Sequence, residues 1–130
     1  MLRMLKKFSP LLLLVGLATG CASTFSNLTP KSQPRNANHL YPVEVAFHSR
    51  QQSLLWETIQ PFVNVGPEFY PMRPTLLMAN RWEALVPVPA GKSVVQYRYK
   101  FEFKYNAVGQ LPQNDSALSP NYTLRITDGK

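Results

Sequence analysis

The feature that most constrains the fold is an unbroken alternation of apolar and polar residues between Val95 and Asn106. A helix would scatter the apolar residues around its circumference, because 3.6 residues per turn does not match a period of two. The stretch therefore predicts a long β-strand with one buried face. One face carries Val95, Tyr97, Tyr99, Phe101, Phe103 and Tyr105, and the other carries Gln96, Arg98, Lys100, Glu102, Lys104 and Asn106.

Shorter alternations predict further strands on both sides of this one. Val43, Val45 and Phe47 alternate with polar or small residues, and Tyr122, Leu124 and Ile126 do the same near the end of the chain. The segment 51–60 fits either a short helix or a strand. With turn residues recurring between these segments, we expect about six or seven strands and an all-β fold, an antiparallel β-sandwich of immunoglobulin-like size. A β-barrel of similar strand count is the alternative.

Proline and glycine predict how the strands connect. The turn Pro89–Lys92 separates the apolar segment 82–88 from the long strand, which predicts a hairpin between them. Pro87 and Pro89 donate no backbone hydrogen bond, so this part of the strand should lie at a sheet edge or end. The segments 66–80 and 109–120 are predicted loops, long enough to form a binding rim.

The segment Asn80–Gly91, followed by Gln96–Phe101, resembles the strand–turn–strand of early-set immunoglobulin-like domains, including starch-binding modules. A tryptophan opens the first strand, a Pro-x-Gly turn follows, and a Tyr-x-Tyr-Lys-Phe strand returns. The resemblance covers about a fifth of the chain and implies an immunoglobulin-like sandwich. Carbohydrate binding is the activity that it implies for some members.

The N-terminus predicts export. Arg3, Lys6 and Lys7 precede the apolar run Leu11–Leu17, which is too short to cross a bilayer of about 30 Å and is typical of a signal peptide. The run ends in Leu17–Cys21, Leu-Ala-Thr-Gly-Cys, which resembles the lipobox of bacterial lipoproteins. The resemblance implies cleavage after Gly20, a diacylglyceryl group on the Cys21 sulfur, and acylation of the new amine. The alternatives are an ordinary secretory signal and a buried N-terminal helix.

The same resemblance predicts a location in the cell. Ala22 stands where an aspartate would favour inner-membrane retention, so an outer-membrane anchor in the bacterial cell envelope is expected, facing the periplasm or the surface. We expect a signal peptide over 1–20, a lipidated N-terminus and flexible linker over 21–40, and the sandwich over 41–130. Removal of the signal peptide lowers the formal charge from +7 to +4, because it takes three cations and no acid.

No pattern in the sequence indicates catalysis. The chain has one cysteine, which the lipid would occupy, and two histidines, and no nucleophile elbow, phosphate-binding glycine loop or metal-ligand spacing is present. His39 and His48 are more simply read as structural residues. We therefore predict no catalytic residue, no metal site, no cofactor and no enzymatic activity.

Candidate binding residues fall into two groups. The cations Arg98, Lys100 and Lys104 share the polar face of the long strand and could contact anionic lipid or an acidic partner, although a solvated strand face explains them too. The aromatic candidates are Trp56, Trp82 and Tyr70, and the aromatic row of the long strand fits either a core or a platform for stacking sugar rings.

We therefore expect a membrane-anchored envelope lipoprotein that acts as a non-catalytic structural or protein-interaction module. The alternative is a lipid-tethered carbohydrate-binding module of the early-set type, and a further possibility is an accessory subunit of a secretion or appendage complex. An envelope protein is the expected partner and a glycan is possible. Nucleic acid is not expected, because the protein is exported.

Overall fold

The structure is a computed structural model that describes residues 23–128, and within that range it contains ten strands and no helix. The predicted signal peptide and Cys21 lie outside the described residues. The strands are β1 (Ser23–Asn27), β2 (Ser32–Pro34), β3 (Leu40–Ser49), β4 (Leu54–Val65), β5 (Glu68–Pro71), β6 (Arg73–Pro74), β7 (Arg81–Pro87), β8 (Val94–Tyr105), β9 (Gln113–Leu118) and β10 (Tyr122–Thr127).

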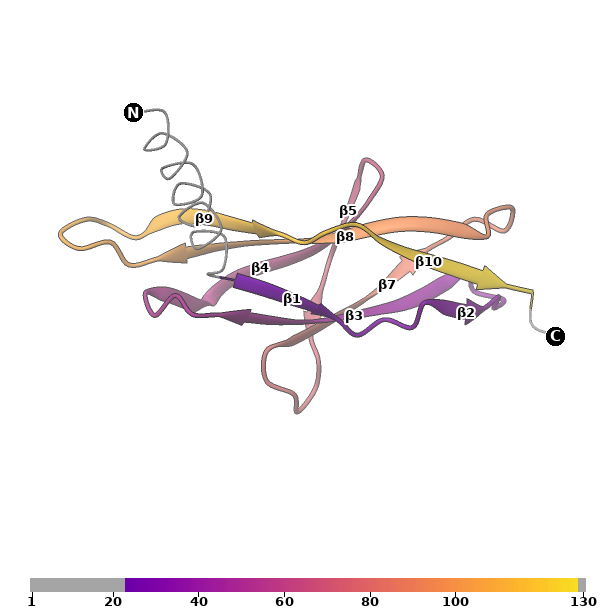
Figure 1. Cartoon of the computed structure of the whole chain (residues 1–130), viewed down its shortest axis with the longest axis horizontal. Coiled ribbons are helices and arrows are strands. Elements are labelled where there is room, and N and C mark those ends of the chain that lie inside the picture. The colour runs from indigo at the N-terminus through magenta and orange to yellow at the C-terminus, as the bar shows by residue number, and fades with distance from the viewer. Residues whose placement is uncertain (1–22, 129–130) are drawn as a thin grey trace, which may run out of the picture.

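The strands form two sheets that pack face to face in an elongated sandwich (Figure 1). One sheet has the order β1-β3-β7-β6, and the other has the order β2-β10-β8-β4-β5, with β9 also paired to β8. All of these pairs are antiparallel except β2 with β10, which is parallel. The all-β sandwich expected from the alternation is confirmed.

The core lies between the inner faces of β3 and β8. Tyr99 and Phe101 of β8 are fully buried, as is Phe47 of β3, which confirms the core interpretation of the aromatic row. The Phe101 ring lies 4.9 Å from Phe47, 5.1 Å from Phe25 and 5.1 Å from Trp82, measured between centroids. Aromatic pairs at such distances contribute about 0.5–1.5 kcal/mol each beyond their burial, so β8 holds both sheets together.

The predicted hairpin between segments 82–88 and 94–106 is wrong. β7 pairs with β3, with Val45 opposite Trp82, and belongs to the other sheet from β8. The turn at Pro89–Lys92 instead carries the chain from one layer to the other. Turn residues specify a reversal of direction, but the apolar faces of β7 and β8 both point into the core, so the two strands face one another across it.

The predicted loop 109–120 is also largely wrong, because residues 113–118 form β9 along the edge of β8. Ser119 continues the pairing: its amide donates to the Tyr99 carbonyl at 2.9 Å, and its hydroxyl accepts from the Tyr99 amide at 2.7 Å. β10 then pairs with the remainder of β8. Polar side chains in 113–118 hid this strand, because it lies at an exposed edge where little is buried.

The segment 51–60, left open between helix and strand, enters β4 at Leu54. Its register against β8 shifts between Leu55 and Gln60, where the backbone bulges. Thr58 fills the gap in the ladder: its hydroxyl accepts from the Lys104 amide at 2.9 Å and donates to the Leu55 carbonyl at 2.6 Å. The bulge explains why the apolar residues here follow no single period.

The described part of the predicted linker, from residue 23 onward, is not a free tether. β1 pairs with β3 along five residues, and β2 pairs with β10. Between them, Asn27 donates to the Tyr97 hydroxyl at 2.9 Å and accepts from the Tyr99 hydroxyl at 2.6 Å, and Thr29 is buried at 3.0 Å from the Tyr99 hydroxyl. The serine, asparagine and proline content of this segment suggested a linker. In the structure, the side chains of Asn27 and Thr29 instead provide hydrogen-bond partners for buried tyrosines.

Since residues 23–128 contain no helix, the described part of the chain has no helical segment that could span a bilayer.

Candidate interaction surface

The outer face of the larger sheet carries the three cations that the sequence singled out. Arg98, Lys100 and Lys104 alternate with the buried aromatic residues of β8, so all three point away from the core. Arg98 and Lys100 are half-buried and Lys104 is exposed. The structure therefore places these candidates together on one face.

Neighbouring strands bring apolar side chains to the same face. Phe62 of β4 and Leu118 of β9 stand opposite Lys100 on its two sides. Phe69 of β5 packs its ring edge-on against Phe62 at 6.4 Å, and the Lys100 ammonium lies 5.7 Å from the Phe69 centroid, within cation–π range. We call Phe62, Phe69, Arg98, Lys100 and Leu118 the cation–aromatic surface.

The sequence analysis missed the apolar members of this surface. Phe69 is 51% exposed and Leu118 is 53% exposed. Exposed apolar side chains are informative where they gather on one face, as these do around Lys100. The position of Phe62 relative to Lys100 depends on the register of β4 against β8. Because that register is set beyond a bulge, no spacing in the sequence could have predicted it.

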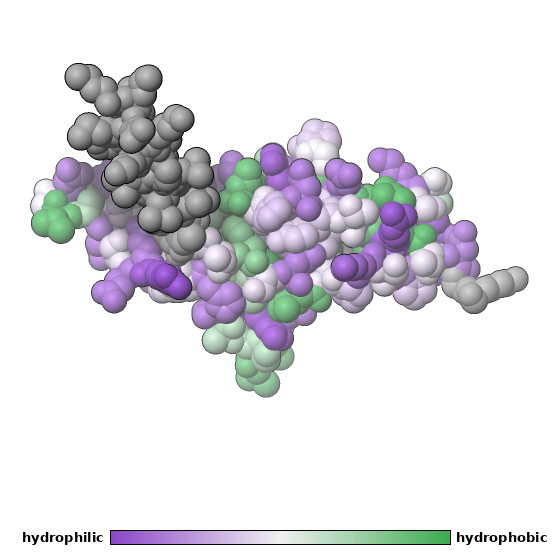
Figure 2. All heavy atoms as spheres, in the orientation of Figure 1, coloured by the Kyte–Doolittle hydropathy of each residue, from purple (hydrophilic) through white to green (hydrophobic). Residues whose placement is uncertain are grey.

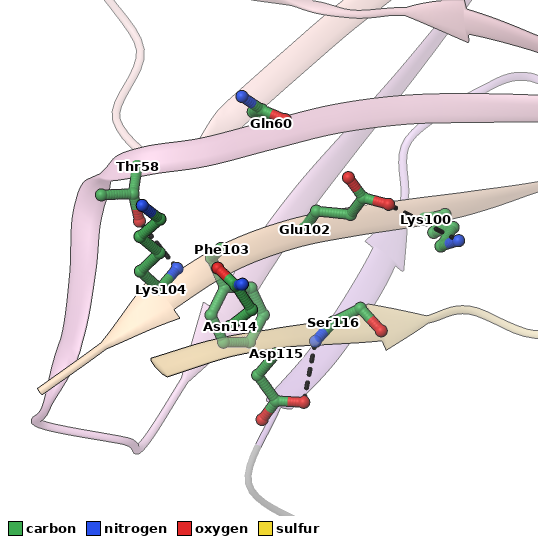
Figure 3. Close-up of a pocket in the computed structure, with 9 residues that line it drawn as sticks. All are labelled: Thr58, Gln60, Lys100, Glu102, Phe103, Lys104, Asn114, Asp115 and Ser116. Carbon is green, nitrogen blue, oxygen red and sulfur yellow. Dashed lines mark hydrogen bonds and ion pairs between the residues drawn. The ribbon is translucent and has the colours of Figure 1, made fainter. Parts of the chain in front are cut away.

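An open groove of about 620 Å³ continues from this surface between β4, β8 and β9 (Figure 3). Lys100 and Glu102 form its boundary with the cation–aromatic surface and are paired, with Nζ 3.6 Å from Oε2. The groove is lined by Thr58, Gln60, Lys100, Glu102, Phe103, Lys104, Asn114, Asp115 and Ser116. Its exposed walls are mostly polar, and its one aromatic member, Phe103, is buried.

The two carboxylates of the groove have different partners, because Glu102 pairs with Lys100 and Asp115 does not. Glu102 and Asp115 point in different directions in Figure 3, and the Asp115 carboxylate accepts a hydrogen bond from the Ser116 amide at 2.8 Å. Within residues 23–128, no group of three or more His, Cys, Asp or Glu side chains is arranged to hold a metal ion. The groove offers hydrogen bonds and charges of both signs.

The aromatic candidates lie apart from the three cations. Tyr70 of β5 stands opposite Val63 of β4 and packs against the core. Trp82 is half-buried, with its ring edge-on to Phe101. Trp56 is 39% exposed at the β4 bulge and contacts Phe47, 6.1 Å between centroids. Cys21, the predicted lipidation site, lies outside the described residues.

A second apolar feature is the loop between β6 and β7, which projects from the lower side of the sandwich in Figure 1 and contains the exposed side chains Leu76 and Leu77. Leu77 has a positive φ of 63°, as does Asn80 at 60°. A left-handed backbone costs a leucine of order 1 kcal/mol, so the loop carries local backbone strain at Leu77.

The fold and surface define an all-β, two-sheet sandwich with an exposed cationic and aromatic face. A scan against protein-family models, a search of curated proteins and a search of solved structures return no match to this chain.

Proposed function

We propose that this protein is a lipid-anchored, non-catalytic interaction module of the bacterial cell envelope, which binds a protein partner through the cation–aromatic surface. The observation that carries the proposal is the exposure of Phe69 and Leu118 around Lys100. Protein interfaces favour aromatic residues and arginine at their centres, with polar groups at the rim. Arg98 and the polar groove beside Lys100 supply both kinds of contact.

A protein partner is favoured over a glycan because the surface lacks a broad, open aromatic platform. Tyr97 and Tyr99, which could have stacked on sugar rings, are 3% and 0% exposed. Lys100 occupies one face of the Phe69 ring, and Trp82 packs inward. The early-set resemblance of segments 80–91 and 96–101 therefore supports the shape of the fold more than sugar binding.

The absence of catalysis is part of the proposal. The groove carboxylates diverge, and the side chain of Asp115 is engaged by the backbone of Ser116. His48 is exposed on β3, away from the groove. These positions support a role in binding.

The anchor is proposed from the lipobox-like Leu17–Cys21 segment and from Ala22, which favours the outer membrane. Its test is Cys21→Ser in the full chain. Because two or more acyl chains give durable attachment, the variant should leave the membrane fraction or accumulate unprocessed, as mass spectrometry and fractionation would show. Unchanged, detergent-dependent membrane association of the variant would contradict the anchor.

The partner surface is tested by photocrosslinking in the cells that make the protein. A photoreactive amino acid is placed at Phe69, at Leu118, or at Leu85 as a control. Leu85 matches Leu118 at 53% exposed but lies on β7 in the other sheet. We expect one stoichiometric protein adduct from Phe69 and Leu118 and none from Leu85.

Charge reversal provides the second arm of the test. Lys100→Glu should abolish co-purification of the crosslinked partner, whereas Lys92→Glu, on the turn before β8, should not. Equal adducts from all three crosslinking positions, or no adduct at Phe69, would contradict the assigned surface. Retention of the protein on envelope polysaccharide, lost in Phe69→Ala, would favour the carbohydrate-binding alternative instead.

A further inference from the structure

The tip of the β8–β9 hairpin exposes apolar side chains to solvent. Val108 and Leu111 are 102% and 83% exposed, and neither contributes to the core. Figure 2 shows apolar residues at the left end of the molecule, where Figure 1 places this hairpin tip. Isolated exposed leucines are ordinary, but two largely exposed branched side chains at one loop tip form a small apolar patch that projects from the fold.

The register of the strands places this tip at the same end of the molecule as the start of β1. Ser23 pairs with Ser49, the last residue of β3. The turn that follows β3 then contacts the hairpin, where the Asn106 amide donates to the Ser53 carbonyl at 2.9 Å. Figure 1 shows β1 starting toward the end at which the β8–β9 hairpin lies.

The chain between the proposed anchor and this end is very short. Ser23 is two positions after Cys21. Two residues span at most about 7 Å even when fully extended. A lipid on Cys21 would therefore enter the bilayer close to the start of β1, on the side of the molecule where the hairpin tip projects.

We infer that the hairpin tip, through Val108 and Leu111, inserts into the membrane leaflet that holds the Cys21 lipid. The inference rests on the proposed lipidation and adds a second, protein-based membrane contact. Charged side chains near this end are of both signs, with Arg50 and Lys104 against Glu57 and Asp115, so apolar insertion carries the contact rather than attraction to anionic headgroups.

The second contact sets the orientation of the sandwich. A lipid at one point leaves a domain free to rotate, whereas a lipid and an inserted loop restrict rotation to the axis that joins the two contacts. β8 then points away from the bilayer. Lys100 lies five positions before Tyr105, the end of β8, which holds the cation–aromatic surface about 17 Å from that end of the strand.

The test uses the full, processed protein in vesicles of phosphatidylethanolamine and phosphatidylglycerol, with an environment-sensitive NBD dye on an introduced cysteine. Val108→Cys reports on the tip. Gly91→Cys, in the turn at the opposite end of β8, is the control, because a side chain there meets nothing within 4 Å. We expect blue-shifted emission that nitroxide-labelled lipids quench at position 108, and water-like, unquenched emission at position 91.

Variants at the tip separate insertion from general adhesion. Leu111→Asp, combined with Val108→Cys, should remove the blue shift and the quenching. Leu76→Asp in the β6–β7 loop, where the leucine is also 83% exposed, should leave both unchanged. Water-like emission at position 108 would overturn the inference, and so would a blue shift without lipid quenching, since the tip would then contact protein.

The same sample reports on the anchor separately. A Cys21 sulfur that carries the diacylglyceryl group does not react with the dye, so mass spectrometry should find one dye and the lipid on each chain. Two dyes per chain would reveal a free Cys21 thiol and contradict the proposed anchor together with this inference. One dye, an intact lipid and water-like emission at position 108 would contradict the insertion alone.

Discussion

At the scale of single residues, Tyr99 links the two sheets. Its side chain is fully buried, and its hydroxyl donates to Asn27 at 2.6 Å beside the Thr29 hydroxyl. Burial raises the pKa of Tyr99 far above its usual value of 10.0, because the ionised phenolate would lose its hydration. Burial also raises the pKa of Tyr122, which lies 5.8 Å from Tyr99 between ring centroids.

These shifts predict a loss of stability in alkali. The folded state keeps the Tyr99 proton above pH 10 while the unfolded state releases it, so the stabilisation is complete below pH 10 and falls as the pH rises further. Tyr99→Phe should lower the free energy of unfolding at pH 7 by about 1–2 kcal/mol through lost hydrogen bonds. Above pH 10 the stability of Tyr99→Phe should decline less steeply than that of the wild type. The two slopes should differ by up to about 1.4 kcal/mol per pH unit, the contribution of one tyrosine.

Urea unfolding between pH 7 and 11.5 measures both effects. Tyr122 should leave a residual slope in Tyr99→Phe. Parallel stability curves for wild type and Tyr99→Phe would show that Tyr99 does not carry the alkaline transition.

At the scale of elements, the β4 bulge shapes the groove. Three more residues separate Leu55 from Gln60 than separate their partners Lys104 and Glu102, so the β4 backbone leaves the β8 ladder there. Thr58 fills the gap with both of its hydrogen bonds and lies on the groove wall (Figure 3). The bulge is thus both a break in the sheet and the reason for a hollow on its outer face.

Thr58→Val removes the hydroxyl while keeping the shape of the side chain. The Lys104 amide and the Leu55 carbonyl lose their partner, so the free energy of unfolding should fall by about 1 kcal/mol, the low end expected where water can reach the groups. Thr58→Ser keeps the hydroxyl and should lose less than half as much. Guanidinium unfolding compares the three proteins, and equal midpoints would mean that the bulge is held by other contacts.

At the scale of the whole molecule, the N-terminal segment covers one edge of each sheet, through β1 and β2. From β1, Phe25 packs on Phe47 and Phe101 in the core. After β2, Arg35 binds the Asp128 carboxylate at 2.8 Å and the Ala90 carbonyl at 2.9 Å. A segment that reads as a linker is thereby part of the folded unit.

This arrangement predicts the outcome of truncation. A chain that begins at Leu40 loses β1, β2, the Phe25 ring and the hydrogen-bond partners of Tyr97 and Tyr99. Phe25 is partly buried against the core, so its loss should cost less than the about 3–5 kcal/mol of a fully buried phenylalanine. The loss of two paired strands adds to this cost, against a total of about 5–15 kcal/mol that is typical of a domain. The chain from Leu40 should therefore show no cooperative thermal transition by circular dichroism.

A chain that begins at Ser23 is the matched comparison and should unfold cooperatively. Equal melting temperatures for the two chains would restore the linker interpretation for residues 23–39. The comparison also matters for binding experiments, since a fragment from Leu40 would present an incomplete sandwich.

The sequence by itself determined the class of fold and the identity of its central strand. The period of two from Val95 to Asn106 leaves one way to bury five aromatic rings on one side, and the structure buries four of them almost completely. The grouping of Arg98, Lys100 and Lys104 on one face follows from the same period. These are local properties, because alternation within one strand fixes which side chains share a face.

Only the tertiary structure decided what lies beside that strand. Pairing of β7 with β3 instead of β8, the strand β9 at an edge, and the pairing of β1 and β2 all depend on contacts between residues far apart in the chain. Phe62 and Phe69 join Lys100 through a register set beyond a bulge, and the hairpin tip and the start of β1 share one end through two successive pairings. Such pairings are selected by burial and hydrogen bonding across the whole sandwich, which no local pattern encodes.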